Sequence, residues 1–301
     1  MIKKELATGV VIFDIITNTG ERFIVCSALG HLYNLFPVEK NRKNYPIYDV
    51  IWSPRHSAIV REKRRITQTL KVIEDISKAA TRFIHACDYD LEGELIGYNI
   101  LQYACNNKYD VSKRAKFSSL TNSEINQSFN NLQDTNIRIA DAAKARHLTD
   151  FIFGINLSRA LVNCLNVSNQ TYQYHNLTMG RVQGPTLGFV VNREIKVRSH
   201  IPDPLWHISG KFDDGCSIFK ANLNSAVHRS SDIEKILTSC QNQMGVVNQL
   251  VQRNKKLAPP TPFNLTKLQK EAFRIFKIPP ITTLLVSESL YLAGLISYPR
   301  T

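Results

Sequence analysis

The feature that most constrains the fold is an apolar run followed at once by an acidic cluster and a helical pattern. The run Thr81–Cys87 is mostly apolar and predicts a short buried strand. Glu92, Gly93 and Glu94 then open an apolar-periodic stretch from Leu95 to about Asn106, which predicts a helix. Open α/β sheets place their ligands at the carboxyl ends of strands. The sequence therefore predicts an α/β unit with its acidic cluster at a ligand-binding edge.

The acidic cluster also has a spacing that suits a metal ion. Asp88, Asp90 and Glu92 alternate, so in extended chain their side chains point the same way. Three convergent carboxylates repel one another without a cation, and hard oxygen ligands suit Mg²⁺. The alternative is that the acids cap a helix and complement its dipole. That alternative accounts for Glu92 and Glu94 and explains Asp88 and Asp90 less well.

A second candidate centre lies at the other end of the chain. Tyr298 is bracketed by Gly294 and Pro299, which predicts a turn or a strand end there. A tyrosine hydroxyl can act as a covalent nucleophile, and Arg300 is suited to hold a phosphate. A lone tyrosine is more often a half-buried aromatic residue, so spacing alone favours that reading.

The charge balance points to a polyanionic partner. The 301 residues carry a formal net charge of +13 and have an isoelectric point near 9.5, as nucleic-acid-binding proteins often do. A hydrophobic content of 43% and this length predict two or three domains. The six cysteines include no CxxC pair, which favours a reducing compartment without a zinc ribbon. Neither a signal peptide nor a membrane span is predicted.

The remaining pattern gives an order of elements. A hairpin is predicted from Gly9–Thr17 and Arg22–Ala28, and residues 206–251 read as strand-like around one helix at Ser231–Cys240. Residues 179–185 predict a loop, with Pro185 starting the next helix, and residues 257–262 predict a linker. Helices are predicted at Ile66–Ala79, Ser118–Leu132, Ile137–Leu165, Thr186–Lys196, Leu265–Phe276 and Thr282–Leu292.

Six segments, taken in order, resemble a known family, the type IA DNA topoisomerases, and most of all its archaeal topoisomerase I and eukaryotic topoisomerase III branch. Six motifs in one order are far more specific than any one alone. They span nearly the whole chain and read Ser27-Ala28-Leu29-Gly30-His31-Leu32, Asp88-Tyr89-Asp90-Leu91-Glu92-Gly93-Glu94, Ala145-Arg146-His147 with Gly154–Leu161, Gly180–Leu187, Pro259–Leu265 and Leu295–Thr301.

The resemblance implies an α/β plus α fold in four parts. Residues 1–138 would form a Toprim domain, which is a Rossmann-like α/β unit, and residues 139–200 a helical DNA-binding domain. Residues 201–258 would be the first part of a mixed α+β arch domain. Residues 259–301 would begin the gate domain that carries the tyrosine.

The resemblance also implies a site and a reaction. Tyr298 would attack single-stranded DNA and form a 5′-phosphotyrosine link, with Arg300 on the scissile phosphate and His31 near the Toprim centre. Mg²⁺ would be held by Asp88, Asp90 and Glu92, and no ATP would be needed. Strand passage would then relax or decatenate DNA. The residues expected to contact DNA are Arg146, Arg159, Arg181 and Gln183.

Two departures from the family pattern carry further expectations. Family members begin with a strand that ends in Glu-Lys-Pro or Glu-Lys-Ser, and Met1–Ala7 has no such motif. Family members also continue past the segment that ends here at Thr301. We therefore expect a chain truncated at both ends, with weak activity unless a second chain supplies the missing pieces, and a helicase as a further partner. A cytoplasmic, nucleoid-associated or, in a eukaryote, nuclear location is expected.

The alternative function is a catalytically inactive chain or subunit that only binds single-stranded DNA. A Toprim nuclease or primase is a weaker alternative, because neither explains the segment around Tyr298.

Overall fold

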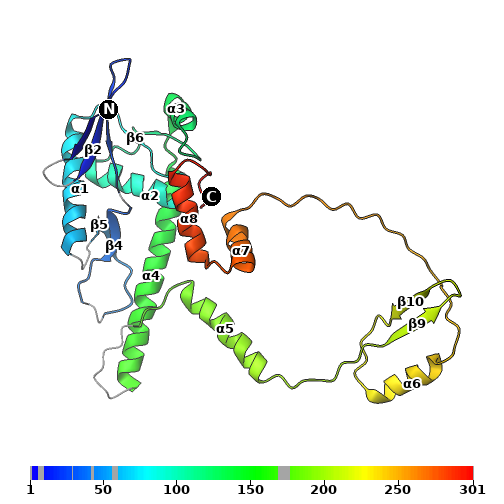
Figure 1. Ribbon diagram of the computed structural model, residues 1–301. Coiled ribbons are helices and arrows are strands. Elements are labelled where there is room, and N and C mark those ends of the chain that lie inside the picture. Colours follow the sequence, from blue (N-terminus) through cyan, green and yellow to red (C-terminus); the bar gives the residue numbers. More distant parts are fainter. Residues whose placement is uncertain are drawn as a thin grey trace. The chain divides into compact units, whose positions relative to one another are not determined.

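The computed structural model describes residues 2–5, 10–28, 30–41, 44–55, 60–168 and 177–300 (Figure 1). The chain divides into two compact units, which are treated separately below. The first unit combines residues 1–184 with residues 262–301, and the second comprises residues 185–261. The second unit is therefore an insertion in the first. Gly9, Leu29 and Thr301, which belong to segments singled out above, lie outside the described residues.

The first unit begins with a three-stranded antiparallel sheet in the order β1-β2-β3. The hairpin of β2 (Val11–Ile16) and β3 (Arg22–Cys26) confirms the sequence prediction, whereas β1 (Ile2–Glu5) was not predicted. Alternate residues of β2 are buried, and Ile12 packs with Val72 of helix α1 (Val60–Ala79). A half-buried strand with this alternation fixes the face of the sheet that meets the helix.

A second hairpin and helix α1 enclose the main hydrophobic core. Strands β4 (Tyr33–Pro37) and β5 (Val50–Pro54) pair antiparallel. The loop between them is fixed to helix α4 (Ile137–Ser168), because Asn156 accepts from the Ile47 amide at 2.6 Å and donates to its carbonyl at 2.8 Å. The core contains Leu32, Tyr33, Ile66, Leu70, Ile73, Leu101, Ala104, Cys105, Tyr109 and Ala140.

The acidic cluster lies in a small mixed sheet. Strand β6 (Ile84–His85) runs parallel to β7 (Lys113–Arg114), and β7 pairs antiparallel with β8 (Gln133–Asp134). Between β6 and β7 the chain forms helix α2 (Leu91–Asn99) and a π-helical turn, η1 (Ile100–Ala104). The acids thus follow the carboxyl end of a parallel strand, as predicted, although that strand has only two residues.

Four further helices of the first unit complete the frame of the site. Helix α3 (Asn122–Asn130) is shorter than predicted, and the long helix α4 (Ile137–Ser168) packs against α2. Helices α7 (Leu265–Phe276) and α8 (Pro280–Leu292) pack on each other, and Pro280 is the first residue of α8. Thr283, Ser287 and Tyr291, spaced four apart, form the buried face of α8.

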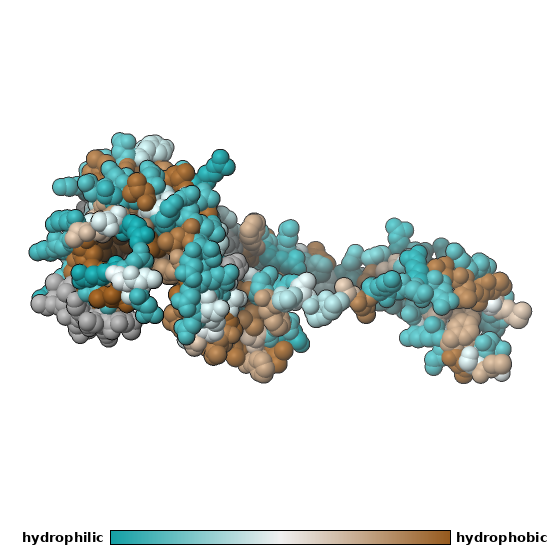
Figure 2. All heavy atoms as spheres, turned by 90° about the horizontal axis from the view of Figure 1, so that it is seen from above, coloured by the Kyte–Doolittle hydropathy of each residue, from teal (hydrophilic) through white to brown (hydrophobic). Residues whose placement is uncertain are grey.

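The second unit is small and loosely packed. It holds most of helix α5 (Gln183–Arg198), the hairpin of β9 (Ser209–Asp213) and β10 (Ile218–Asn222), and helix α6 (Ser230–Cys240). Apolar side chains reach its surface, in brown in Figure 2; Ile218 is 70% exposed. The prediction of strand-like structure for residues 241–251 was wrong, because these residues form no regular element. The apolar residues of segment 241–251 do not alternate regularly with polar ones, so they cannot form one face of a sheet.

Helix α5 starts earlier than predicted. Its first residue is Gln183, so Gln183 lies in the helix and Pro185 is the third helical residue instead of the first. The position is still compatible with proline, because the first four amide groups of a helix have no acceptor within it. Every helix among the described residues is too short or too polar to span a bilayer.

Candidate active site

The acidic turn is built as the N-terminal cap of helix α2. Asp90 has extended backbone angles (φ −141°, ψ 179°), and its Oδ1 accepts a hydrogen bond from the Gly93 amide at 2.6 Å. This is the usual geometry of an aspartate N-cap. The alternative raised above therefore holds in part: Asp90 is the N-cap, and Glu92 and Glu94 lie in the first turn of α2, where carboxylates complement the helix dipole.

The structure brings Asp88 and Asp90 together with the C-terminal segment. Tyr298 donates its hydroxyl hydrogen to Asp90 Oδ2 at 2.7 Å. Tyr291, in helix α8, donates its hydroxyl hydrogen to Asp88 Oδ1 at 3.1 Å. Two carboxylates and two phenols thus meet across about two hundred residues of chain. Tyr291 was missed, because its contact with Asp88 joins residues far apart in the chain.

Tyr298 is held by its backbone and its ring as well as by its hydroxyl. Its amide donates to the Ser118 carbonyl at 2.7 Å. Its ring makes an edge contact with Tyr291 at a centroid distance of 5.1 Å. Burial, the hydrogen bond to Asp90 and the negative charge of Asp90 raise the pKa of Tyr298 well above its usual value. In this arrangement Tyr298 is a neutral phenol at neutral pH.

The side chain of Glu92 does not point toward the two tyrosines, as the side chains of Asp88 and Asp90 do. Strand β6 ends at His85, and Glu92 lies in the first turn of α2, so the alternation of an extended chain does not reach it. Its Oε2 is hydrogen-bonded instead to His31 Nε2 at 2.9 Å and to His147 Nε2 at 2.8 Å. The predicted set of three carboxylates is therefore divided in this structure.

His31, Glu92 and His147 form a compact group, which we call the His–Glu cluster. Their candidate ligand atoms all lie within 4.8 Å of one another, and the imidazole centroids are 5.2 Å apart. Burial lowers the pKa of His31, against the opposing effect of Glu92. Burial alone would raise the pKa of Glu92, but the two histidines lower it below its usual range. His147 was quoted above only as part of a motif.

Arg300 lies close to the tyrosine in sequence but is paired elsewhere. Its guanidinium forms an ion pair with Glu288 of helix α8, and 47% of the Arg300 side chain is exposed. An exposed pair of this kind contributes little to stability and exchanges readily with other anions. The guanidinium is thus available to a phosphate that competes with Glu288.

The predicted DNA-contact residues lie in helix α4, in the segment just before helix α5 and at the start of α5. Arg146 Nη1 lies 3.5 Å from Glu92 Oε1, and Arg146 Nε lies 3.9 Å from Asp150 Oδ2. Arg181 Nε lies 2.6 Å from Asp150 Oδ1, so Asp150 joins the two arginines. Gln183 is exposed at the start of α5. Arg159 donates to the carbonyls of Asn41 and Asn44, which fixes the β4–β5 loop.

A network of hydrogen bonds between buried side chains holds the acidic turn in place. The Arg114 side chain is 1% exposed, and it donates to the carbonyls of His85, Cys87 and Asp88 at 2.8–3.1 Å. Its Nε donates to Glu94 Oε2 at 3.1 Å, and Tyr109 donates to Glu94 Oε1 at 2.8 Å. Glu94 therefore serves this network as well as lying in the first turn of α2. Glu94 belongs to the acidic motif, whereas Tyr109 and Arg114 gave no motif signal in the sequence.

Two glycines of α2 allow the close packing of this turn. A Cβ atom at Gly93 would lie 2.2 Å from the Asp88 carbonyl oxygen, and one at Gly97 would lie 2.2 Å from the His85 ring. Neither position has room for a larger residue without a backbone or ring shift. The turn depends on glycine at both positions.

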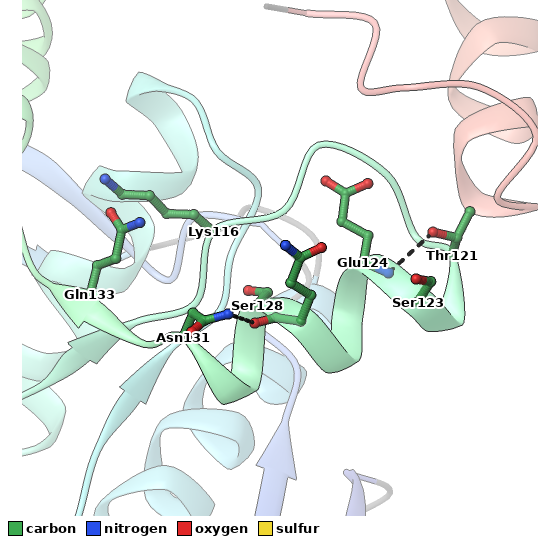
Figure 3. Close-up of a pocket in the computed structure, with 8 residues that line it drawn as sticks. Lys116, Thr121, Ser123, Glu124, Ser128, Asn131 and Gln133 are labelled. Carbon is green, nitrogen blue, oxygen red and sulfur yellow. Dashed lines mark hydrogen bonds between the residues drawn. The ribbon is translucent and has the colours of Figure 1, made fainter.

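A separate polar depression lies along helix α3 (Figure 3). The Asn131 amide donates to the Gln127 carbonyl at 3.1 Å, and the Glu124 amide donates to Thr121 Oγ1 at 3.4 Å. These contacts stabilise the helix itself. The depression is lined by Lys116, Thr121, Ser123, Glu124, Gln127, Ser128, Asn131 and Gln133.

Two known protein families match this chain, one in each part of the sequence. Residues 7–120 match the Toprim domain family, and residues 134–301 match the DNA topoisomerase family. Similar proteins include the DNA topoisomerase 1 of Pyrococcus horikoshii (39% identical, 100% of this chain and 43% of that protein) and that of Methanothermobacter thermautotrophicus (38% identical, 93% and 38%). The DNA topoisomerase 1 of Methanocaldococcus jannaschii is 37% identical over 99% of this chain and 38% of its own length.

A Toprim domain followed by a topoisomerase domain defines the class of protein. The chain belongs to the type IA DNA topoisomerase family. It spans about two fifths of the length of the curated relatives named above.

Proposed function

We propose that this chain carries the DNA cleavage and religation centre of a type IA topoisomerase, with Tyr298 as the nucleophile. The observation that supports this most directly is the 2.7 Å hydrogen bond from the Tyr298 hydroxyl to Asp90 Oδ2. It joins the proposed nucleophile to the proposed metal-binding turn across a sequence separation of 208 residues. The proposed substrate is single-stranded DNA.

The reaction would be a transesterification in which bonds are exchanged one for one. The Tyr298 oxygen attacks the phosphorus, the P–O3′ bond breaks, and a 5′-phosphotyrosine and a 3′-hydroxyl are formed. Asp90 Oδ2, which already accepts the phenol hydrogen, is in position to receive the phenol proton, and the leaving oxygen takes up a proton. Religation is the reverse attack by the 3′-hydroxyl. Because one ester replaces another, the cycle needs no ATP.

The donor set at the acidic turn fits a hard divalent cation. Mg²⁺ is commonly held by one or two carboxylates together with substrate phosphate and water. Asp88 and Asp90 supply such a pair on the side that faces Tyr298. Glu92 would be a third ligand after leaving the two histidines. A bound Mg²⁺ would supply positive charge that stabilises the phosphate and the phenolate.

Positively charged residues around the turn would position the DNA. Arg300 would exchange Glu288 for the scissile phosphate, and His31 would act from the Toprim side. Arg146 and Arg181 would hold the DNA backbone beside the site, with Gln183 at the start of α5. Arg159 was predicted to contact DNA, and its proposed contribution is through the loop that it anchors. Strand passage that relaxes or decatenates DNA would follow from the cleaved state.

The proposal is tested with a 3′-end-labelled single-stranded oligonucleotide incubated with the full chain and Mg²⁺, then quenched with denaturant. A 5′-phosphotyrosine link leaves the 3′ label on the protein, so a labelled protein band is expected with wild type. Tyr298→Phe should abolish it, whereas Tyr48→Phe, which alters an exposed tyrosine, should leave it unchanged. A band that persists in Tyr298→Phe would overturn the assignment of the nucleophile. No band in wild type, with DNA still bound, would favour the inactive binding chain.

A further inference from the structure

The His–Glu cluster is a second group of potential metal ligands beside the proposed Mg²⁺ site. It consists of His31 from the loop before β4, Glu92 from the first turn of α2 and His147 from α4. We propose that the His–Glu cluster is a binding site for a transition-metal dication such as Zn²⁺, Co²⁺ or Ni²⁺, and that this site competes with the aspartates for Glu92.

The positions of the donor atoms support a shared cation. Both Nε2 atoms lie 2.8–2.9 Å from the same oxygen, Glu92 Oε2. Around a tetrahedral zinc ion with bonds of about 2.0–2.2 Å, neighbouring ligand atoms are roughly 3.3–3.5 Å apart. The two contacts therefore need to open by only about half an ångström. A cation would replace the two protons that now form hydrogen bonds between the Nε2 atoms of the histidines and Glu92 Oε2.

The surroundings of the cluster fix Glu92 and leave an approach from solvent. Arg146 lies near the other carboxylate oxygen, Oε1, at 3.5 Å, so Oε2 is the oxygen directed at the imidazoles. The side chains of His31 and His147 are each 26% exposed and that of Glu92 is 33% exposed. Three protein ligands with one open side are the arrangement of many zinc sites that accept water or a further ligand.

The chemistry of the donors distinguishes this site from the aspartate pair. Imidazole nitrogen favours zinc, cobalt, nickel and copper over magnesium, whereas the carboxylates of Asp88 and Asp90 are hard oxygen ligands. In this structure Oε2 of Glu92 faces the two imidazoles and Oε1 lies near Arg146, so neither oxygen is shared with the aspartates. Occupation of the His–Glu cluster would therefore hold Glu92 away from Asp88 and Asp90. This consequence rests on the proposed function, while metal binding itself does not.

The direct test is calorimetric titration of the full, chelator-treated chain with Zn²⁺ alone. One site is expected. His147→Ala and, separately, His31→Gln should each weaken binding by about 100-fold or more, because even altered partners of ligands cost 10–100-fold. His228→Ala, at an exposed histidine of the second unit, should leave the affinity unchanged. Equal affinity in wild type and in both cluster variants would overturn the proposal.

Cobalt substitution excludes a competing explanation. Cys164, Cys216 and Cys240 are exposed free thiols that also attract soft metals. The near-ultraviolet spectrum of the Co²⁺-loaded chain should lack the intense sulfur-to-cobalt charge-transfer bands of thiolate ligation. Such bands, retained in His147→Ala, would place the metal on cysteine and contradict the assignment.

A second readout addresses the competition for Glu92. In the cleavage assay with saturating Mg²⁺, added Zn²⁺ should suppress the labelled protein band in wild type and much less in His147→Ala. Suppression of equal strength in both would overturn the competition. Failure of wild type to form any band would instead count against the proposed function, and the calorimetric result would stand.

Discussion

The hydroxyl groups of Tyr298 and Tyr291 each donate a hydrogen bond to one aspartate of the acidic turn, to Asp90 and Asp88 respectively. Burial and the neighbouring aspartates raise the pKa of both phenols well above the usual value. A neutral phenol that donates to a carboxylate is a weak nucleophile. A cation between the aspartates would reverse the sign of the local field and favour the phenolate. If Tyr298 is the nucleophile, as proposed, it is inactive in this arrangement until positive charge is present.

The acidic turn is sensitive to the volume of a single side chain. Gly93→Ala would place a Cβ atom 2.2 Å from the Asp88 carbonyl oxygen. We expect the free energy of unfolding to fall by about 1–3 kcal/mol, as for other overpacked positions. Chemical denaturation measures this change. Gly154→Ala in α4, whose Cβ atom would be 3.4 Å from its nearest neighbour, should be neutral or slightly stabilising. Equal losses in both variants would contradict the account.

A local pattern singled out Asp88 and Asp90, which follow an apolar run. Spacing alone favoured an ordinary half-buried role for Tyr298, and only the family resemblance assigned it the role of nucleophile. The contacts of Tyr291 and His147 are made by residues far apart in the chain, and no local pattern encodes them. The orientation of the Glu92 side chain could not be predicted from the sequence either, because it depends on where a two-residue strand ends and a helix begins.

At the scale of elements, Arg114 joins strand β7 to the turn that follows strand β6. The two strands share only two residue pairs, which is little pairing for a parallel contact. The buried guanidinium adds bonds to the carbonyls of residues 85, 87 and 88. The position of the acidic turn therefore depends on a side chain more than on the sheet.

Removal of that side chain should be costly. Arg114→Met leaves Glu94 buried without its main charged partner, and we expect a loss of about 3–5 kcal/mol in the free energy of unfolding. The neighbouring Lys113 forms an exposed ion pair with Asp134, so Lys113→Met should cost about 1 kcal/mol or less. The midpoints of urea unfolding compare the two variants. A loss from Arg114→Met no larger than that from Lys113→Met would refute the supporting role.

Element boundaries show where local patterns stop being sufficient. Helices α4, α7 and α8 were predicted close to their observed bounds, whereas α1 begins at Val60, six residues before the predicted start at Ile66. Strand β6 is only two residues long, because the chain turns to present the acids. Helix α5 extends back over Gly184 to Gln183, since the preceding loop is held by Ser158 of α4 through Met179. Such tertiary contacts override local propensity.

At the scale of the whole molecule, the net charge of +13 governs the expected behaviour toward DNA. The logarithm of the binding constant should fall linearly with that of salt concentration, with a slope near −0.7 for each phosphate neutralised on single strands. Arg181→Gln should reduce the slope by about 0.7. Lys235→Gln, in helix α6 of the second unit, serves as the control and should leave it unchanged. Fluorescence anisotropy at several salt concentrations measures the slopes, and an unaltered slope in Arg181→Gln would remove that residue from the interface.

The hydrogen bond between Tyr298 and Asp90 has a consequence for the order in which the chain folds. It closes a loop of 208 residues that contains the whole second unit. The entropy lost on closing a flexible loop grows only with the logarithm of its length, by about 0.6 kcal/mol per doubling. Long-range contacts of this kind nevertheless form slowly, after local helices and hairpins. We therefore expect Tyr298 to meet Asp90 as a late folding event, and we expect changes in the length of the inserted unit to have little effect on the stability of that pairing.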